Sequence, residues 1–594
     1  MRRKALFITF GLLGFLTAGI YLETAFWTEA ARSLLRSLSV PAAILNYGAT
    51  GRAFRHLRLV RPVRNDEALY PLSDYRAPGL YASIFQKKRI VDQWLYTANR
   101  DWLSELSTFP VPLPDEAPPV QPTAEWPVLA VRITPQDLTS DPWGIETNYK
   151  GHGREWERPA AITYFAAGQK PFMSLAGMRL HGGTSRAPGQ KHSFRLYFRE
   201  ELGASEFEPG LGADRPVRHL VVHADWPPES PFSGLLSFDA AERMGCTVPA
   251  TKPVRFFLNG KDQGLYFLSE QISRKEWVSR MGHPDFVMHI FKAEREREAH
   301  QQYGDFHRWV IRQPAPLLSE TFEDIADLDN MIAYVFSMVY CGVSDGYQGA
   351  AIRDNREAVP KWRWINWDMD HGFVDVYGGT EPRENWQQES WERAILHPGE
   401  PKYSHWRNRG DAPSVLFGRL VRDDPAFCRR AVRWVMDTLN HTLTHEFLSS
   451  RIDHYELLAK SFGRTDLKFI EEYRNFIDHR PAFLRERMKN YFGVGDAFLC
   501  RVSAPANLPV VIDGLSTNSS YDGWYFEGES IGLSAPEEGR WLVNGIPLDE
   551  REVSLTVTQN LDIVWNQISN PTASIRISSD PRDGSVTAAL RATR

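Results

Sequence analysis

Two aspartates two residues apart, Asp368 and Asp370, close an apolar run in the segment KWRWINWDMDHGF (361–373). Side chains alternate between the two faces of a strand, so both carboxylates are predicted to point the same way. Converging carboxylates repel each other unless a cation lies between them, and a hard divalent cation is the usual solution. A solvated turn or a strand cap is the alternative for this motif. The pattern predicts a metal site, provided that the rest of the chain supports it.

A third acid, Asp345, precedes Asp368 by 368 − 345 = 23 residues. It follows the apolar segment 327–340, which is predicted to be a helix, and it lies in the glycine-containing stretch CGVSDGYQ. An Asp on a turn, followed by an Asp at a strand end, is the order of acids in protein-kinase-like phosphoryl transfer. The three acids therefore favour phosphoryl transfer as the chemistry of this region.

Two hairpins and a helix are predicted ahead of these acids. Residues 177–199 form a strand, a glycine-rich tip and an alternating strand, and residues 252–272 flank an Asn259-Gly260 turn. Residues 231–245 between them have helical spacing, and Gly245 is predicted to end that helix. The pattern from 431 to 492 is helical throughout, with Pro481 interrupting near a turn. This order predicts a small β-rich lobe, then a helical lobe, with the acids at their junction.

The N-terminal segment predicts the compartment. Met1-Arg2-Arg3-Lys4 is positively charged, and Ala5–Leu22 is uncharged and apolar. A helix of that length spans ~27 Å, close to the ~30 Å of a hydrocarbon core. We expect an uncleaved signal anchor, with the bulk of the chain extracytoplasmic in the periplasm or at the cell surface, or secreted if the anchor is cleaved.

Composition changes mark the remaining boundaries. A Pro-rich linker ends near residue 124, and after Gly493 the chain becomes rich in short alternating runs typical of a β-sandwich. The predicted units are an anchor (1–26), a helical stalk and linker (27–124), a two-lobe domain (125–495) and a C-terminal β-rich domain (496–594).

Charge and cysteine content exclude two classes. The net charge of −5 over 594 residues gives no support to nucleic-acid binding, which would need a basic face. The four cysteines are far apart and form no CxxC pair, which argues against structural zinc.

At this point the chain resembles the spore-coat protein H (CotH) kinase family over roughly residues 125–495. The resemblance rests on four pieces in the family's order, which are WERP at 156–159, LHGGTSRAPGQKHSFRLYF at 180–198, NGKDQGLYFLSEQ at 259–271, and Asp345 with WINWDMDHGF at 364–373. It implies an α+β fold, atypical but protein-kinase-like, that binds ATP with Mg²⁺ or Mn²⁺. The implied acceptor is a hydroxyl of protein Ser or Thr, and a glycan or a lipid head group is left open.

The resemblance also implies roles for individual residues. Asp345 would accept the proton of the acceptor hydroxyl, and Asp368 would bind the metal. Asp370 is expected on the ion or directly beside its ligands. Glu270, at the end of the second hairpin, would lie at the nucleotide hinge.

The cation that would face the phosphates is not settled by the pattern. Lys191 and Arg195 share one face of a predicted strand, so either could bind phosphate, and Arg186 is the third candidate. All three could instead belong to a solvated face. Gly182-Gly183 would let backbone N–H groups approach an anion closely, or could form only a turn.

One departure from the family keeps a second function open. The family usually carries an Asn shortly after its catalytic Asp, for a second metal ion. Here the stretch is GYQGA (346–350), in which Gln348 is the candidate ligand. The alternative is a catalytically silent envelope protein that binds a partner or a surface polysaccharide. A metal-dependent hydrolase using Asp368 and Asp370 is the third hypothesis, which the lack of an accompanying His cluster in the sequence disfavours.

Overall fold

The computed structural model describes residues 69–71, 108–110 and 114–592, with internal gaps at 140–143, 154–155, 201, 212–214, 225–226, 292–296, 344–347, 375–383, 389–390, 396–411, 506–507, 518–519, 536–538, 549, 568–572 and 580–585. The predicted anchor and most of the predicted stalk lie outside these residues. Within the described part of the chain, no helix is both long enough and apolar enough to cross a bilayer. Helices and sheets occur together throughout, which confirms the α+β class.

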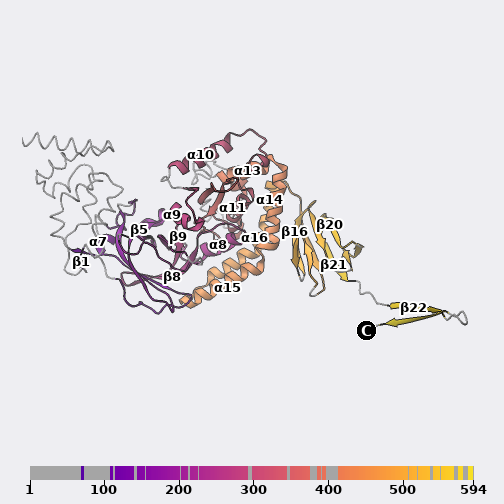
Figure 1. The fold of residues 1–594 in the computed structure, drawn as a ribbon, viewed down its shortest axis with the longest axis horizontal. Coiled ribbons are helices and arrows are strands. Elements are labelled where there is room, and N and C mark those ends of the chain that lie inside the picture. Colours follow the sequence, from indigo (N-terminus) through magenta and orange to yellow (C-terminus); the bar gives the residue numbers. More distant parts are fainter. Residues whose placement is uncertain are drawn as a thin grey trace, which may run out of the picture.

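A closed barrel of seven strands forms the first large unit (Figure 1). Its order is β3-β4-β5-β6-β7-β9-β8, with bounds β3 Val128–Arg132, β4 Arg158–Phe165, β5 Phe172–His181, β6 Ser193–Tyr197, β7 His219–His223, β8 Thr251–Leu258 and β9 Lys261–Glu270. Parallel pairing of β3 with β8 closes it. Apolar side chains such as Ile162, Leu196 and Phe256 fill the interior, so the barrel has a packed core.

Both predicted hairpins are confirmed within this barrel. Strands β5 and β6 pair in antiparallel fashion around the glycine-rich tip, as do β8 and β9. Asn259 and Gly260 join the second pair with φ angles of 52° and 78°. Two consecutive positive φ values are what a tight hairpin turn requires, and Asn-Gly supplies them at little cost.

Helices and a small sheet follow the barrel. The helices are α7 Pro135–Leu138, α8 Ser233–Arg243, α9 Arg274–Met281, α10 Arg297–Arg312, α11 Leu328–Cys341, α12 Trp391–Ile395, α13 Ala412–Asp423, α14 Pro425–Asp437, α15 His445–Phe462 and α16 Lys468–Phe492. Strands β10 Phe286–Ile290, β11 Gly349–Asp354 and β12 Arg363–Asn366 form the three-stranded sheet. Helix α11 is buried on nearly all sides, because the other elements pack around it.

Helix α11 begins and ends as its sequence predicts. The Asp327 side chain accepts a hydrogen bond from the Asn330 N–H, which caps the first turn. Gly342 ends the helix with a φ of 68°, a left-handed conformation that glycine adopts freely.

The predicted break at Pro481 is wrong. Helix α16 runs from Lys468 to Phe492 with Pro481 in its interior. Proline removes one backbone donor and usually kinks a helix. Here apolar side chains on both sides of it, including Ile477 and Leu484, are buried in one continuous core. That packing outweighs the loss of a single hydrogen bond.

The C-terminal part is a β-sandwich, as predicted. One sheet has the order β16-β13-β21-β18-β19 and the other the order β15-β14-β17-β20. Their bounds are β13 Ala497–Ser503, β14 Val510–Ile512, β15 Leu515–Thr517, β16 Tyr521–Phe526, β17 Ser530–Ser534, β18 Gly539–Val543, β19 Ile546–Leu548, β20 Glu552–Thr556 and β21 Leu561–Gln567. A separate apolar core that includes Trp541 and Trp565 lies between the sheets. Two short pairs, β1 Leu69–Pro71 with β2 Thr108–Pro110 and β22 Ala573–Ser579 with β23 Val586–Ala592, complete the described elements.

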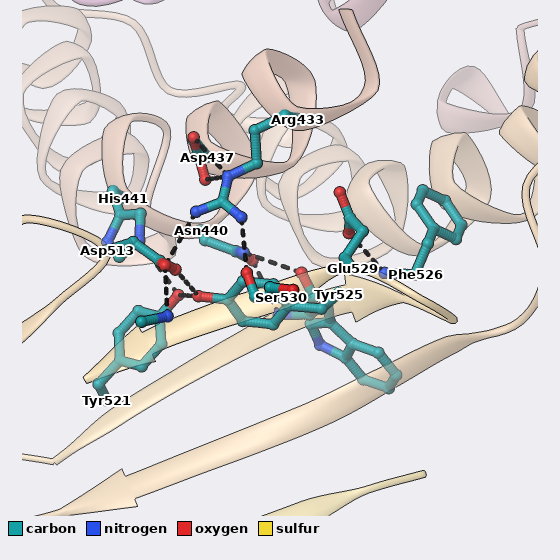
Figure 2. Close-up of polar contacts among 12 residues, drawn as sticks. Arg433, Asp437, Asn440, His441, Asp513, Tyr521, Tyr525, Phe526, Glu529 and Ser530 are labelled. Carbon is teal, nitrogen blue, oxygen red and sulfur yellow. Dashed lines mark hydrogen bonds and ion pairs between the residues drawn. The ribbon is translucent and has the colours of Figure 1, made fainter. Parts of the chain in front are cut away.

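A polar network joins the sandwich to the helices (Figure 2). Arg433 of α14 lies 3.0 Å from Asp437 on its own helix and 3.0 Å from Asp513 of the sandwich. The Asp513 carboxylate also accepts a hydrogen bond from the Tyr525 hydroxyl at 2.7 Å. Asn440 donates to the backbone carbonyl of Trp524 and accepts from its N–H, both at 2.9 Å. These contacts fix the sandwich against the end of α14.

Candidate active site at the junction of barrel and helices

The start of β11 and the end of β12 lie side by side in the three-stranded sheet. Strand β11 begins at Gly349 and β12 ends at Asn366, and these two residues pair directly. The chain therefore enters β11 and leaves β12 at the same end of these two strands. Asp345, in the gap at 344–347, lies outside the described residues, so its predicted role stays a prediction.

Gly349 cannot carry a side chain in this fold. Its φ is 133°, and a Cβ atom there would lie 1.9 Å from the carbonyl oxygen of Ile365. Only glycine permits this approach between β11 and β12.

The Asp-Met-Asp motif forms a turn and does not continue the strand, so this part of the prediction is wrong. Strand β12 ends at Asn366, and Asp368 has a φ of 58°. Aspartate tolerates this left-handed conformation better than most residues. The Ser233 hydroxyl at the start of α8 donates to the carbonyl oxygen of Asp370 at 2.6 Å, which fixes the turn against that helix.

A second close approach fixes the end of the turn. A Cβ atom on Gly372 would lie 2.1 Å from the Ser237 Oγ of α8 and 3.2 Å from the Cβ of Cys341. The Phe373 N–H donates to the carbonyl oxygen of Cys341 at 2.8 Å. The motif is therefore enclosed between the first turns of α8 and the last turn of α11.

A histidine from a distant part of the sequence completes the cluster. His223, Asp368 and Asp370 each offer one ligand atom, and these atoms all lie within 4.8 Å of one another. The sequence shows no cluster of histidines beside the two aspartates, but the fold adds this single one. His223 ends barrel strand β7, and long-range packing brings it to the two aspartates. A histidine at the end of a predicted strand was the only signal in the sequence.

These three side chains fit a divalent cation. Carboxylate and imidazole ligands bind such ions at about 2.0–2.2 Å, so ligand atoms on opposite sides of one ion are about 4.0–4.4 Å apart. The three ligand atoms lie within 4.8 Å of one another, which is close enough for them to converge on one ion. Burial and, to a smaller extent, the positive charge of Lys191 lower the pKa of His223 to about 4. The imidazole is then neutral at pH 7, which is the form that binds metals.

The cluster lies in the wall of a pocket between the barrel and the helices. The pocket is lined by His223, Gly234, Leu235, Phe238, Thr251, Phe267, Ser269, Trp367, Asp368, Met369 and Asp370. The strands β7, β8 and β9 supply one side of it, whereas α8 and the Asp-Met-Asp turn supply the other. A few polar groups converging in an otherwise apolar pocket are typical of a ligand-binding site.

The structure places the three predicted cations outside the lining of this pocket. The Lys191 Nζ donates to the carbonyl oxygen of Leu265 at 2.6 Å and lies 4.4 Å from the centre of the Tyr266 ring. The Arg195 Nη2 lies 2.7 Å from the Nδ1 of His181. Arg186 is buried and donates to the carbonyl oxygen of Gly151 at 2.5 Å. None of the three is among the described residues that line the pocket.

His181 connects Arg195 to the acidic cluster. Its ring centre lies 6.3 Å from that of His223 and 6.2 Å from that of Trp367. Burial holds the pKa of His181 well below its usual value, and the nearby guanidinium of Arg195 adds to the effect. A neutral histidine, His181, therefore lies next to both Arg195 and His223. The positive charge of Lys191 lowers the pKa of His223.

The carboxylate of Glu270 is not brought to this pocket. It lies 3.4 Å from Arg215 and 3.2 Å from Arg280. It lines a different pocket together with Glu276. Neighbouring Ser269 lines the first pocket, and successive side chains of a strand face opposite ways. Any contribution of Glu270 to a nucleotide would come from its backbone.

Gln348 is buried directly before β11. Its backbone carbonyl oxygen accepts a hydrogen bond from the Tyr334 hydroxyl of α11 at 3.0 Å. It is not among the described residues that line the pocket, so metal binding by its side chain stays a prediction.

The buried carboxylate of Glu276 should make the stability of the protein depend on pH. Burial, with a smaller contribution from the charge of Glu270, raises its pKa from 4.5 to about 7. The folded state then binds this proton more tightly than the unfolded chain, so the stabilisation is complete below pH 4.5 and is lost as the pH rises through 7. We expect Glu276→Gln to be more stable than the parent at pH 8, by about 3 kcal/mol, and similar to it at pH 4. Urea unfolding across this range measures the difference.

The control is Glu446→Gln, at an exposed glutamate in the first turn of α15. It should follow the parent at every pH. If Glu276→Gln also follows the parent at every pH, the buried carboxylate does not contribute as described.

The comparisons with known proteins agree with this geometry. A family model described as CotH kinase protein matches residues 178–491, which is 314 of the 594 residues. The chain therefore belongs to the CotH kinase family. The matched region begins in β5, includes His223, Asp368 and Asp370, and ends in α16. A search of curated proteins found no match.

Proposed function

We propose that the chain is a metal-dependent kinase that transfers the γ-phosphate of ATP to a hydroxyl group, with protein Ser or Thr as the expected acceptor. The observation that carries the proposal is the convergence of His223, Asp368 and Asp370 on one pocket in a member of the CotH kinase family. On this proposal the barrel and the helices act as the two lobes of a protein-kinase-like domain. The nucleotide then binds between them.

The side chains can be given distinct tasks in this reaction. His223, Asp368 and Asp370 would hold a divalent cation, which when bound neutralises charge on the phosphates. Asp345 would accept the proton of the acceptor hydroxyl as the new bond to phosphorus forms. Lys191 and Arg195 lie close enough to contribute positive charge next to the site.

We further propose that the kinase acts outside the cytoplasm, anchored by the apolar segment Ala5–Leu22. The charged residues before it and the uncharged run itself support this placement. The acceptor would then be a protein or glycan of the cell envelope.

Calorimetric titration of the full chain with ATP tests the proposal, with and without Mg²⁺ or Mn²⁺. Binding that requires a metal ion supports the kinase. Absence of binding with either metal would contradict it and would favour the catalytically silent envelope protein. Release of ADP with a Ser/Thr peptide library, compared with release in the presence of oligosaccharides, then distinguishes the two acceptor classes.

We expect Asp345→Asn to separate binding from turnover. The amide keeps the shape of the side chain but cannot accept the proton, and general base catalysis contributes about 10²–10⁴-fold to a rate. ADP release should fall by about that factor, whereas the Kd for ATP should change less than about threefold, since Asp345 is not assigned to the metal. Titration and turnover measured on the same sample provide both values.

Asp354→Asn, at the far end of β11, is the matched control and should keep both binding and turnover. Equal losses of binding and turnover in Asp345→Asn would refute this division of roles.

A further inference from the structure

We infer that His223 is a protein ligand of the metal ion, and that it makes this site prefer Mn²⁺ to Mg²⁺. The inference rests on the proposed function for the location of the metal site, and adds a ligand and an ion preference. It starts from the geometry of the cluster, in which an imidazole nitrogen and two carboxylate oxygens lie within 4.8 Å of one another.

The position of His223 is set by the barrel and not by the acidic turn. Its strand β7 pairs with β6 on one side and with β9 on the other. His223 itself stands opposite Phe267, which also lines the pocket. The backbone of His223 is therefore held at the pocket wall by its pairing with β9. A ligand fixed in this way loses little freedom when an ion binds.

The chemistry of the donors determines the preferred ion. Mg²⁺ binds oxygen ligands almost exclusively, keeps several waters and demands near-ideal octahedral geometry. Imidazole favours transition metals, and Mn²⁺ also accepts carboxylate, water and phosphate oxygens. One imidazole with two carboxylates therefore suits Mn²⁺ better than Mg²⁺.

The arrangement also gives the ion a structural task. His223 comes from the barrel, whereas Asp368 and Asp370 come from the turn that is fixed against α8 and α11. One bound ion would connect the two sides of the pocket.

The test measures metal binding to the full chain without nucleotide, so that it does not depend on kinase activity. Binding of Mn²⁺ is followed by electron paramagnetic resonance, and Mg²⁺ affinity is measured by its competition with Mn²⁺. In His223→Asn we expect Mn²⁺ affinity to fall at least about tenfold and Mg²⁺ affinity to change less than about threefold, since an amide oxygen still suits Mg²⁺. Unchanged Mn²⁺ affinity, or equal losses for both ions, would overturn the inference.

The control is His283→Asn. His283 is also partly buried and also faces an aspartate, Asp354 at 3.3 Å, but it lies outside the pocket. It should bind both ions as the parent does. A general effect of losing a histidine would appear in both variants and would count against a ligand role for His223.

A spectroscopic measurement on the unmodified chain does not depend on how the variant folds. Electron spin-echo modulation of bound Mn²⁺ should show a directly coordinated imidazole nitrogen, and its absence would overturn the inference. Failure of the kinase proposal looks different: the nitrogen signal would be present, but ATP would not bind.

Discussion

Replacing Asp368 by Asn should remove metal-dependent ATP binding, with a loss of affinity of at least about 100-fold and no measurable turnover. Its carboxylate is one of three ligand groups that converge within 4.8 Å in the pocket wall. Changing residues that only support metal ligands already costs about 10–100-fold in affinity or activity, so loss of a ligand should cost more. Asparagine is chosen because Asp368 has a φ of 58°, which asparagine also adopts readily. Titration with ATP and Mn²⁺ measures the loss.

The matched control for this experiment is Asp513→Asn. Asp513 is also an aspartate with positive φ, 51°, but it lies in the sandwich. It should keep ATP affinity within about twofold when both variants are measured well below their unfolding temperatures, because it lies outside the nucleotide pocket. ATP binding by Asp368→Asn with near-parental affinity would show that the metal does not depend on this carboxylate.

The second large effect is expected at Arg480, where Met should destabilise the fold by about 4 kcal/mol. The side chain is fully buried in α16 and donates to the carbonyl oxygens of Val339 and Tyr340 at the end of α11. It also donates to the carbonyl oxygens of Trp386 and Gln388, both at 2.7 Å. Methionine has a similar length but no donor, so these buried acceptors would lose their partner. Urea unfolding followed by far-ultraviolet circular dichroism measures the change.

Arg474→Met is the control on the same helix. Arg474 forms ion pairs with Asp453 and Glu456, both at 2.8 Å, but its side chain is 40% exposed. Exposed ion pairs contribute about 0–1 kcal/mol, so the loss should be small. Similar losses in the two variants would mean that Arg480 does not stabilise the fold through its buried acceptors.

Loss of Arg480 should also reduce turnover in molecules that remain folded. Two of the carbonyl groups it holds belong to the last turn of α11, directly before the segment that carries Asp345. Arg480→Lys cannot restore them all, since one ammonium group lacks the planar fork of a guanidinium.

Local sequence patterns predicted most individual elements correctly. The alternation in β5, β6, β8 and β9, the Asn259-Gly260 turn and the helical spacing of α8 and α11 all depend on neighbours in the chain. The same applies to the sandwich strands. Closure of the barrel was not predicted, because β3 and β8 pair in parallel across more than a hundred residues. No local pattern encodes such a pairing.

The candidate site also combines residues that could be found from the sequence with one that only the fold reveals. Asp368 and Asp370 could be found from their spacing, although the backbone between them is a turn. His223 could not, since only the packing of β7 against the Asp-Met-Asp turn brings it there. Glu270 is the opposite case. Alternation along β9 shows that, when Ser269 lines the pocket, the carboxylate of Glu270 must face away from it.

The network in Figure 2 has a consequence for how the protein is made. During synthesis the helices emerge from the ribosome before the sandwich, because domains appear in chain order. Until the sandwich folds, Arg433 has no Asp513 and Asn440 has no Trp524 backbone to bind. The end of α14 is therefore completed by the part of the chain that is translated after it. A chain whose synthesis stops before β13 therefore lacks the sandwich and also the sandwich partners of Arg433 and Asn440.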